Sequence, residues 1–124
     1  MKYSEGNTGR VFILRLEKGD IIPDVIEDFA KAKNINSALT FYLGGADKNS
    51  KIISGPEDGN ADKPVPMINV LDEVYESSCF GTIFLNDDKE PKLHMHGSFG
   101  RKKETITGCV REGVNVWLIG EVVI

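Results

Sequence analysis

The sequence predicts a single α+β domain, in which one principal helix packs on a mainly antiparallel sheet. A length of 124 residues is that of one ordinary domain, so we assign residues 1–124 to one unit. Only one segment has helical periodicity, whereas short strand-like segments separated by turns fill most of the rest. One helix with many successive strands is typical of an α+β fold.

The helix is expected over residues 22–33. Asp20 supplies a capping oxygen before it, Pro23 fits its first turn, and Asn34 is a plausible terminator. Its apolar residues recur at spacings of three and four, which predicts one buried stripe: Ile22, Val25, Ile26, Phe29 and Ala30.

The strands are expected from runs of branched, aromatic and alternating residues. A polar, turn-rich stretch at 54–64 interrupts them as a surface loop. The predicted strands are 10–16, 37–45, 51–53, 67–71, 74–78, 81–85, 92–98, 104–110 and 114–124.

Composition excludes several classes of protein. With 40% apolar and 27% charged residues, the chain is too apolar to be disordered throughout. No run approaches the roughly 20 apolar residues of a membrane span, and the first residues lack the apolar core of a secretory signal. We therefore expect a cytoplasmic protein with no membrane partner, whose two cysteines are reduced. A net charge of −4 disfavours general binding to the phosphate backbone of nucleic acids.

The most informative residues are His94 and His96, the only histidines in the chain. Alternate side chains of a strand share a face, and the two Cα atoms would lie about 7 Å apart. Two imidazoles at this spacing can bind one metal ion, with zinc as the first candidate. The alternative is a pair of surface histidines on a solvated strand.

Cys109 is the candidate for a third ligand. If strand 104–110 folds back beside strand 92–98, Cys109 can face the histidines across the ladder. A thiolate is a soft ligand suited to zinc, and three protein ligands leave one position open for water or substrate. The alternative is a buried thiol acting as a small apolar side chain.

Several short segments, spread over nearly the whole chain, form a recognisable series in their order and spacing. They are Gly-Arg-Val-Phe-Ile at 9–13, the helix 22–33, Ser-Ala-Leu at 37–39, Gly-Gly-Ala at 44–46, Gly-Thr-Ile at 81–83, Pro-Lys-Leu-His-Met-His at 91–96, Thr-Gly-Cys-Val at 107–110 and Glu-Val-Val-Ile at 121–124. Together they resemble the PPC ("plants and prokaryotes conserved") domain. The resemblance implies a compact α+β domain that assembles as a homotrimer, and prokaryotic members are named as candidate DNA-binding proteins. In plants the domain accompanies AT-hook segments, and this chain has no Arg-Gly-Arg-Pro hook.

The resemblance also bears on the metal. The PPC fold looks like that of acetolactate decarboxylase, a zinc enzyme with a His-x-His pair and a further histidine. Prokaryotic PPC domains carry a third histidine in a Gly-Gly-His-Leu motif, where this chain has Thr107-Gly108-Cys109-Val110. The departure either exchanges one zinc ligand for another or marks a site that has decayed.

Other side chains are weaker candidates. The basic triplet Arg101 to Lys103 is expected in the hairpin turn beside the histidines, where it could hold an anion or a phosphate, although a solvated turn is the simpler explanation. Glu121 could orient a metal-bound water or a histidine, or serve as an ion-pair partner; Glu73 and Glu76 lie near the same sheet. Trp117 is expected in the core or at a subunit interface.

Two functions compete at this stage. A regulatory or binding module would recognise DNA or a partner protein through the trimer surface. A zinc-dependent lyase or hydrolase would instead polarise a carbonyl or activate water on a small molecule.

Overall fold

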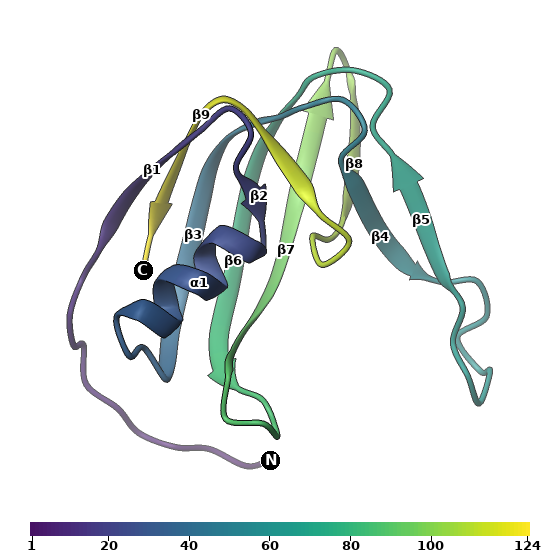
Figure 1. Ribbon diagram of the computed structural model, residues 1–124. Helices are drawn as coiled ribbons and strands as arrows, with labels where there is room; N and C mark the ends of the chain where they lie inside the picture. The colour runs from purple at the N-terminus through teal and green to yellow at the C-terminus, as the bar shows by residue number, and fades with distance from the viewer.

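The computed structural model describes all 124 residues and has one helix and nine strands. The predicted α+β class is confirmed, because a nine-stranded antiparallel sheet carries α1 on one face (Figure 1). No helix is long and apolar enough to cross a membrane. The elements in chain order are β1 (Ile13–Glu17), β2 (Ile21–Ile22), α1 (Asp24–Ala32), β3 (Ser37–Ala46), β4 (Lys51–Pro56), β5 (Pro66–Val70), β6 (Tyr75–Leu85), β7 (Pro91–Arg101), β8 (Glu104–Cys109) and β9 (Val114–Val123).

The sheet has the strand order β1-β9-β3-β6-β7-β8-β4-β5, and the short β2 pairs separately with β9. The long strands β3, β6 and β7 occupy the centre, so the sheet edges are β1 at one end and β5 at the other. We call the face that α1 covers the inner face and the opposite side the outer face. Side chains alternate between the two faces along each strand.

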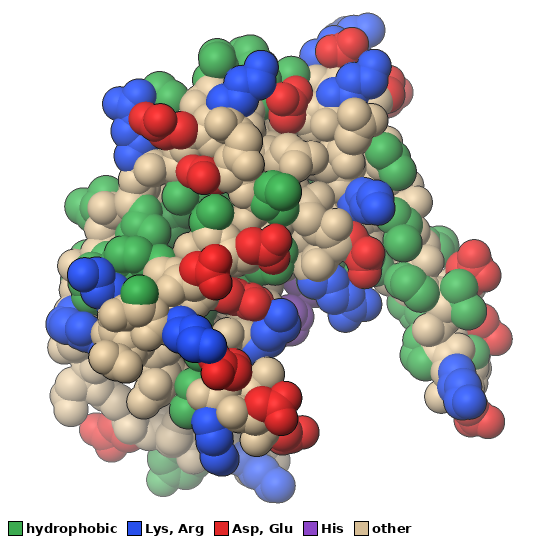
Figure 2. Space-filling view, in the orientation of Figure 1, with side chains coloured by type: hydrophobic (Ala, Val, Ile, Leu, Met, Phe, Trp, Pro, Cys, Tyr) green, Lys and Arg blue, Asp and Glu red, His purple; other side chains and the backbone are tan.

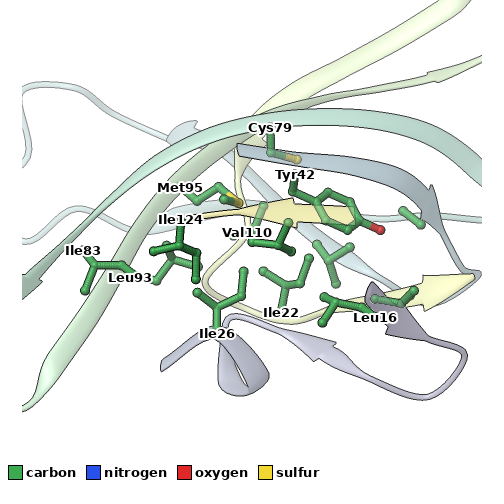
Figure 3. Packing of buried hydrophobic residues seen from close by; sticks show 14 of the residues in the cluster. Leu16, Ile22, Ile26, Tyr42, Cys79, Ile83, Leu93, Met95, Val110 and Ile124 are labelled. Atoms are coloured by element: carbon green, nitrogen blue, oxygen red, sulfur yellow. The ribbon is translucent and has the colours of Figure 1, made fainter. Parts of the chain in front are cut away.

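The core lies between the inner face, α1 and β2. Ile22 and Ile26 point from the helical side towards Ile83, Leu93 and Met95 of the sheet (Figure 3). The predicted buried stripe is confirmed, since Ile22, Ile26 and Ala30 are fully buried. The helix nevertheless begins at Asp24, two residues later than expected, and Ile22 belongs to β2. Burying each large aliphatic side chain contributes about 1.5–3 kcal/mol, so this stripe accounts for the position of α1.

The expected cap of the helix is wrong. No side chain caps α1, and the N-cap residue is Pro23. The Asp20 carboxylate instead accepts a hydrogen bond of 2.8 Å from the backbone N–H of Glu17, which closes the turn after β1. The expected helix end is confirmed, because Asn34 leaves the helix with a φ of 52°.

Several of the expected strand boundaries also differ. The first strand begins at Ile13 and not at residue 10, and β7 continues to Arg101, beyond the expected end at residue 98. The predicted strands 74–78 and 81–85 form one continuous strand, β6, which pairs with β3 along its whole length. The predicted loop 54–64 begins later, because β4 continues to Pro56, which lies opposite Pro66. For β6 and β4, pairing with a neighbouring strand extends regular structure beyond what local composition indicates.

Candidate functional site

The two histidines lie on β7, near the middle of the sheet. This strand alternates strictly in burial: Leu93 and Met95 face the core, whereas His94 and His96 are exposed on the outer face. The start of β7 is fixed to the helix by Glu27. Its carboxylate accepts hydrogen bonds from the Leu93 backbone N–H at 3.0 Å and from the Lys92 ammonium at 2.9 Å. The fold therefore holds both imidazoles on a firmly packed strand.

The imidazoles of His94 and His96 converge. Their Nε2 atoms are 3.2 Å apart, and the rings are nearly perpendicular, at 84°. Two nitrogens bound to one tetrahedral zinc ion at 2.0–2.1 Å are separated by about 3.3–3.4 Å. The donor pair therefore fits a single divalent ion. The same separation also allows an N–H···N hydrogen bond between two neutral rings.

Cys109 lies directly across the ladder from His96, as the sequence predicted for the return strand. Cross-strand partners share a face, with Cβ atoms about 4.5–5.5 Å apart. The Cys109 side chain is only 7% exposed, because β4 adjoins β8 through the pair Ile53–Cys109. No group of three His, Cys, Asp or Glu side chains is close enough to hold a metal ion. The structure thus brings the two imidazoles together and places Cys109 on the neighbouring strand opposite His96, but the three side chains do not form a ready-made metal site.

A shallow recess of about 390 Å³ adjoins His96 on the outer face. The hydroxyl oxygens of Ser98 and Thr107 are 3.1 Å apart within it, and Phe80 forms part of its wall. None of its lining residues is Asp, Glu, Lys or Arg, so it suits a neutral polar group. Sequence reasoning missed these hydroxyls, although Ser98 continues the alternation of His94 and His96.

The weaker candidates lie away from the histidines. Glu121 of β9 is exposed on the outer face, but β3 and β6 separate β9 from β7. Three strand spacings amount to about 14 Å, which is too far for contact with His96. Glu121 pairs in register with Arg15 instead.

The basic triplet is also distant from the histidines, contrary to its expected position beside them. Arg101 follows His96 by five residues, or about 16 Å along β7. Its guanidinium donates a hydrogen bond of 3.0 Å to the Val74 carbonyl. Lys102 and Lys103 line a separate pocket with Tyr75, together with the carboxylates of Asp72 and Glu104.

The second cysteine, Cys79, is an inward-facing residue of the core. Its side chain is 7% exposed, and burial raises the pKa of its thiol to about 12. Burial likewise raises the pKa of Tyr42 to about 12, and the Tyr42 hydroxyl donates to the Gly45 carbonyl. Burial therefore favours the neutral form of both groups near neutral pH.

The sequence matches a family model over residues 3–124, and that model describes the Plants and Prokaryotes Conserved (PCC) domain. The chain belongs to this family. PCC and PPC are two abbreviations for the same domain, so the resemblance found in the sequence is confirmed. Among curated proteins, no sequence matches this PCC domain.

Solved structures share the fold of this PCC domain. A metal-containing protein from Archaeoglobus fulgidus is 27% identical with a TM-score of 0.82, and the match covers 99% of this chain and 83% of that one. A PPC protein from Pyrococcus horikoshii is 26% identical with a TM-score of 0.83, covering 99% and 82%. A candidate DNA-binding protein from Bacteroides thetaiotaomicron is 20% identical with a TM-score of 0.76, covering 98% and 81%, which shows the fold alone.

Proposed function

We propose that this PCC-domain protein is a homotrimeric binding protein with a divalent-metal site, in which His94 and His96 are ligands and Cys109 is the third. The observation that carries the metal site is the 3.2 Å separation of the two Nε2 atoms on the outer face. Rotation of the Cys109 side chain would bring its sulfur towards the ion, because it occupies the cross-strand position of His96. Zinc is the first candidate, since nitrogen and sulfur ligands suit it.

Metal analysis of untagged protein tests this site. We expect about one zinc per chain in the wild type at neutral pH, a small fraction of that in His94→Ala/His96→Ala, and weaker retention in Cys109→Ser. Ser98→Ala is the matched control, because it removes an exposed outer-face polar group from the same strand. Equal and negligible zinc in the wild type and the double variant, after incubation with zinc and dialysis, would remove the metal site from the proposal.

Self-association is supported by the outer face. Large apolar side chains there are at least 40% exposed on four neighbouring strands, and monomeric proteins seldom expose a contiguous apolar patch of this kind. The residues are Ile13 of β1, Val123 of β9, Leu39, Phe41 and Leu43 of β3, and Phe80 and Phe84 of β6. Sedimentation of the wild-type protein measures the number of chains, and a monomer at tens of micromolar would contradict the trimer.

The binding role we propose is a DNA-binding or regulatory one. Two solved relatives of the same fold, from Bacteroides thetaiotaomicron and Ralstonia eutropha, are named as candidate DNA-binding proteins. Charge opposes nonspecific contact with DNA, because three chains of −4 carry −12. Direct recognition would need a focused basic patch, such as the Arg101–Lys103 turn repeated around an axis. Titration of duplex DNA at two salt concentrations decides the matter: no binding at low salt excludes direct recognition, and a steep salt dependence supports it.

The recess beside His96 favours a second function, a zinc-dependent lyase or hydrolase acting on a small molecule. A bound metal ion would supply Lewis acidity at this position. The hydroxyls of Ser98 and Thr107 would orient a neutral polar substrate next to His96. Loss of turnover in Thr107→Val with unchanged zinc content would support this role. A search of small carbonyl compounds and esters in which the wild type and His94→Ala/His96→Ala give the same background rate would exclude it for those classes.

A further inference from the structure

The hairpin formed by β4, β5 and their connecting loop 57–65 projects from the body of the molecule (Figure 1). We call this unit the hairpin arm. It meets the rest of the sheet through a single register pair, Ile53–Cys109, and no residue from Ser54 to Val70 is buried. Figure 2 shows it as a limb separated from the body by a notch, at whose inner end a histidine surface is visible.

The arm exposes several large apolar side chains to water. Val65, Met67, Ile68 and Val70 are between 41% and 56% exposed, and they lie on both faces of the two-stranded ribbon. An isolated two-stranded hairpin is only marginally stable, and an edge strand without charges is open to pairing with another chain. β5 has no charged residue. These features make the arm suited to being covered by a partner surface.

A concave surface with an apolar floor lies at the opposite end of the same sheet. The segment 6–11 runs beside β3 and β9 and leaves a groove of about 700 Å³. Its apolar floor includes Leu39, Phe41 and Val123, which are 58%, 50% and 40% exposed. Arg10 fastens this segment by donating a 2.9 Å hydrogen bond to the Lys33 carbonyl at the end of α1. We call this surface the N-terminal groove.

The charges of the two surfaces are also complementary. The loop of the arm has three carboxylates, Glu57, Asp58 and Asp62, against one lysine, Lys63, which gives it a net charge of −2. The only charged side chain lining the N-terminal groove is Arg10. An acidic loop is unsuited to phosphate, so nucleic acid is not the partner of the arm.

We infer that the hairpin arm of one copy of this chain docks into the N-terminal groove of the next copy. The groove is formed at the β1-β9-β3 end of the sheet and the arm at the β4-β5 end, so the two surfaces cannot meet within one molecule. A contact between two different surfaces is head-to-tail, and it closes into a ring when the rotation between copies allows. This inference rests on the proposed self-association and specifies which surfaces produce it.

Complementary variants test the contact. The arm variant Val65→Asp/Met67→Asp keeps an intact groove, and the groove variant Leu39→Asp/Phe41→Asp keeps an intact arm. Each variant alone should be monomeric by sedimentation and light scattering, whereas an equimolar mixture should form a heterodimer of about twice the 13.7 kDa chain mass. Leu118→Asp is the control, because Leu118 is 54% exposed, lies outside both surfaces and has a φ of 57° that Asp tolerates.

The outcomes separate this inference from the wider proposal. If the wild type and the arm variant are both trimers, the trimer stands and the arm–groove contact is wrong. If both variants are monomers and their mixture remains monomeric, the contact is not head-to-tail and the inference is again overturned. A monomeric wild type overturns self-association and this contact together, while the zinc content of the same sample still reports on the metal site. Circular dichroism of each variant shows whether its fold is retained, and an unfolded double variant is replaced by the single substitution Val65→Asp or Leu39→Asp.

Discussion

Gly108 is the residue on which the junction between the hairpin arm and the body most depends. A Cβ atom at this position would overlap the carbonyl oxygen of Ile53 and lie 2.7 Å from its carbonyl carbon and 2.9 Å from Cγ2 of Ile52. The obstacle is therefore the backbone of β4, which has no rotamer to change. In Gly108→Ala, β4 must move away from β8, and the pair Ile53–Cys109 is the pairing that this movement opens.

The expected cost follows from two opposing effects. Overpacking a filled site costs about 1–3 kcal/mol, and a clash with backbone belongs in the upper part of that range. Replacing glycine by alanine also reduces the conformational entropy of the unfolded chain, which stabilises the folded state by about 0.4–1 kcal/mol. The net loss in the free energy of unfolding is about 2 kcal/mol. For a chain of 124 residues this lowers Tm by roughly 8 °C.

Thermal unfolding followed by circular dichroism, at one protein concentration, measures the change. Gly100→Ala is the matched control on β7, because the nearest atom to its added Cβ is Thr105 Oγ1 at an ordinary 3.6 Å. The thiol of Cys109 should also react faster with a labelling reagent in Gly108→Ala, since β4 no longer covers it. If Gly108→Ala melts within 2 °C of Gly100→Ala and Cys109 stays protected, this account of the β4–β8 junction is wrong.

Three further predictions concern buried polar groups. Thr40→Val should raise the free energy of unfolding in urea by up to about 1 kcal/mol, because the Thr40 hydroxyl is buried without a hydrogen-bond partner; a lower stability would contradict this. Ser50→Ala should lower the free energy of unfolding by about 1–3 kcal/mol. The Ser50 hydroxyl donates a hydrogen bond of 2.7 Å to the Asp47 carbonyl and accepts one of 2.9 Å from the Asn115 N–H, and both are lost. An unchanged urea midpoint would show that these two bonds do not stabilise the fold. The Cys79 thiol, whose pKa burial raises from 9.0 to about 12, should resist alkylation at pH 8 in the native state, where about one thiol in ten thousand is ionised. The thiol ionises at a lower pH in the unfolded chain than in the folded protein. The free energy of unfolding is therefore unaffected by Cys79 below about pH 9 and decreases as the pH rises towards 12. Rapid alkylation of Cys79 in the native state would contradict its burial.

Local sequence accounts for most of the secondary structure. The apolar spacing of the helix and the alternation along β7 reflect fixed geometric periods, so both elements follow from the residues themselves. The errors occur where a distant partner decides the outcome. β2 has only two residues and exists because Ile21 and Ile22 pair with β9, almost a hundred residues later. Asp20 does not cap the helix, because its carboxylate accepts a hydrogen bond from Glu17 in the turn after β1.

The candidate site divides in the same way. That His94 and His96 share a face follows from their spacing of two on a strand, and that Cys109 returns opposite His96 follows from a short hairpin. The 3.2 Å separation of the imidazole nitrogens depends on side-chain rotamers in their tertiary surroundings. The distance of Glu121 from the histidines depends on strand order, because β3 and β6 lie between β9 and β7.

By itself, the sequence determined one small acidic α+β domain, its PPC resemblance, and a histidine pair on one face of a strand. Only the tertiary structure decided that the pair converges, that a neutral hydroxyl-lined recess adjoins it, and that an apolar arm and an apolar groove lie at opposite ends of one sheet. The physical reason is that periodicity acts over a few residues of one element. Strand order and register are instead set by pairing between segments far apart in the chain.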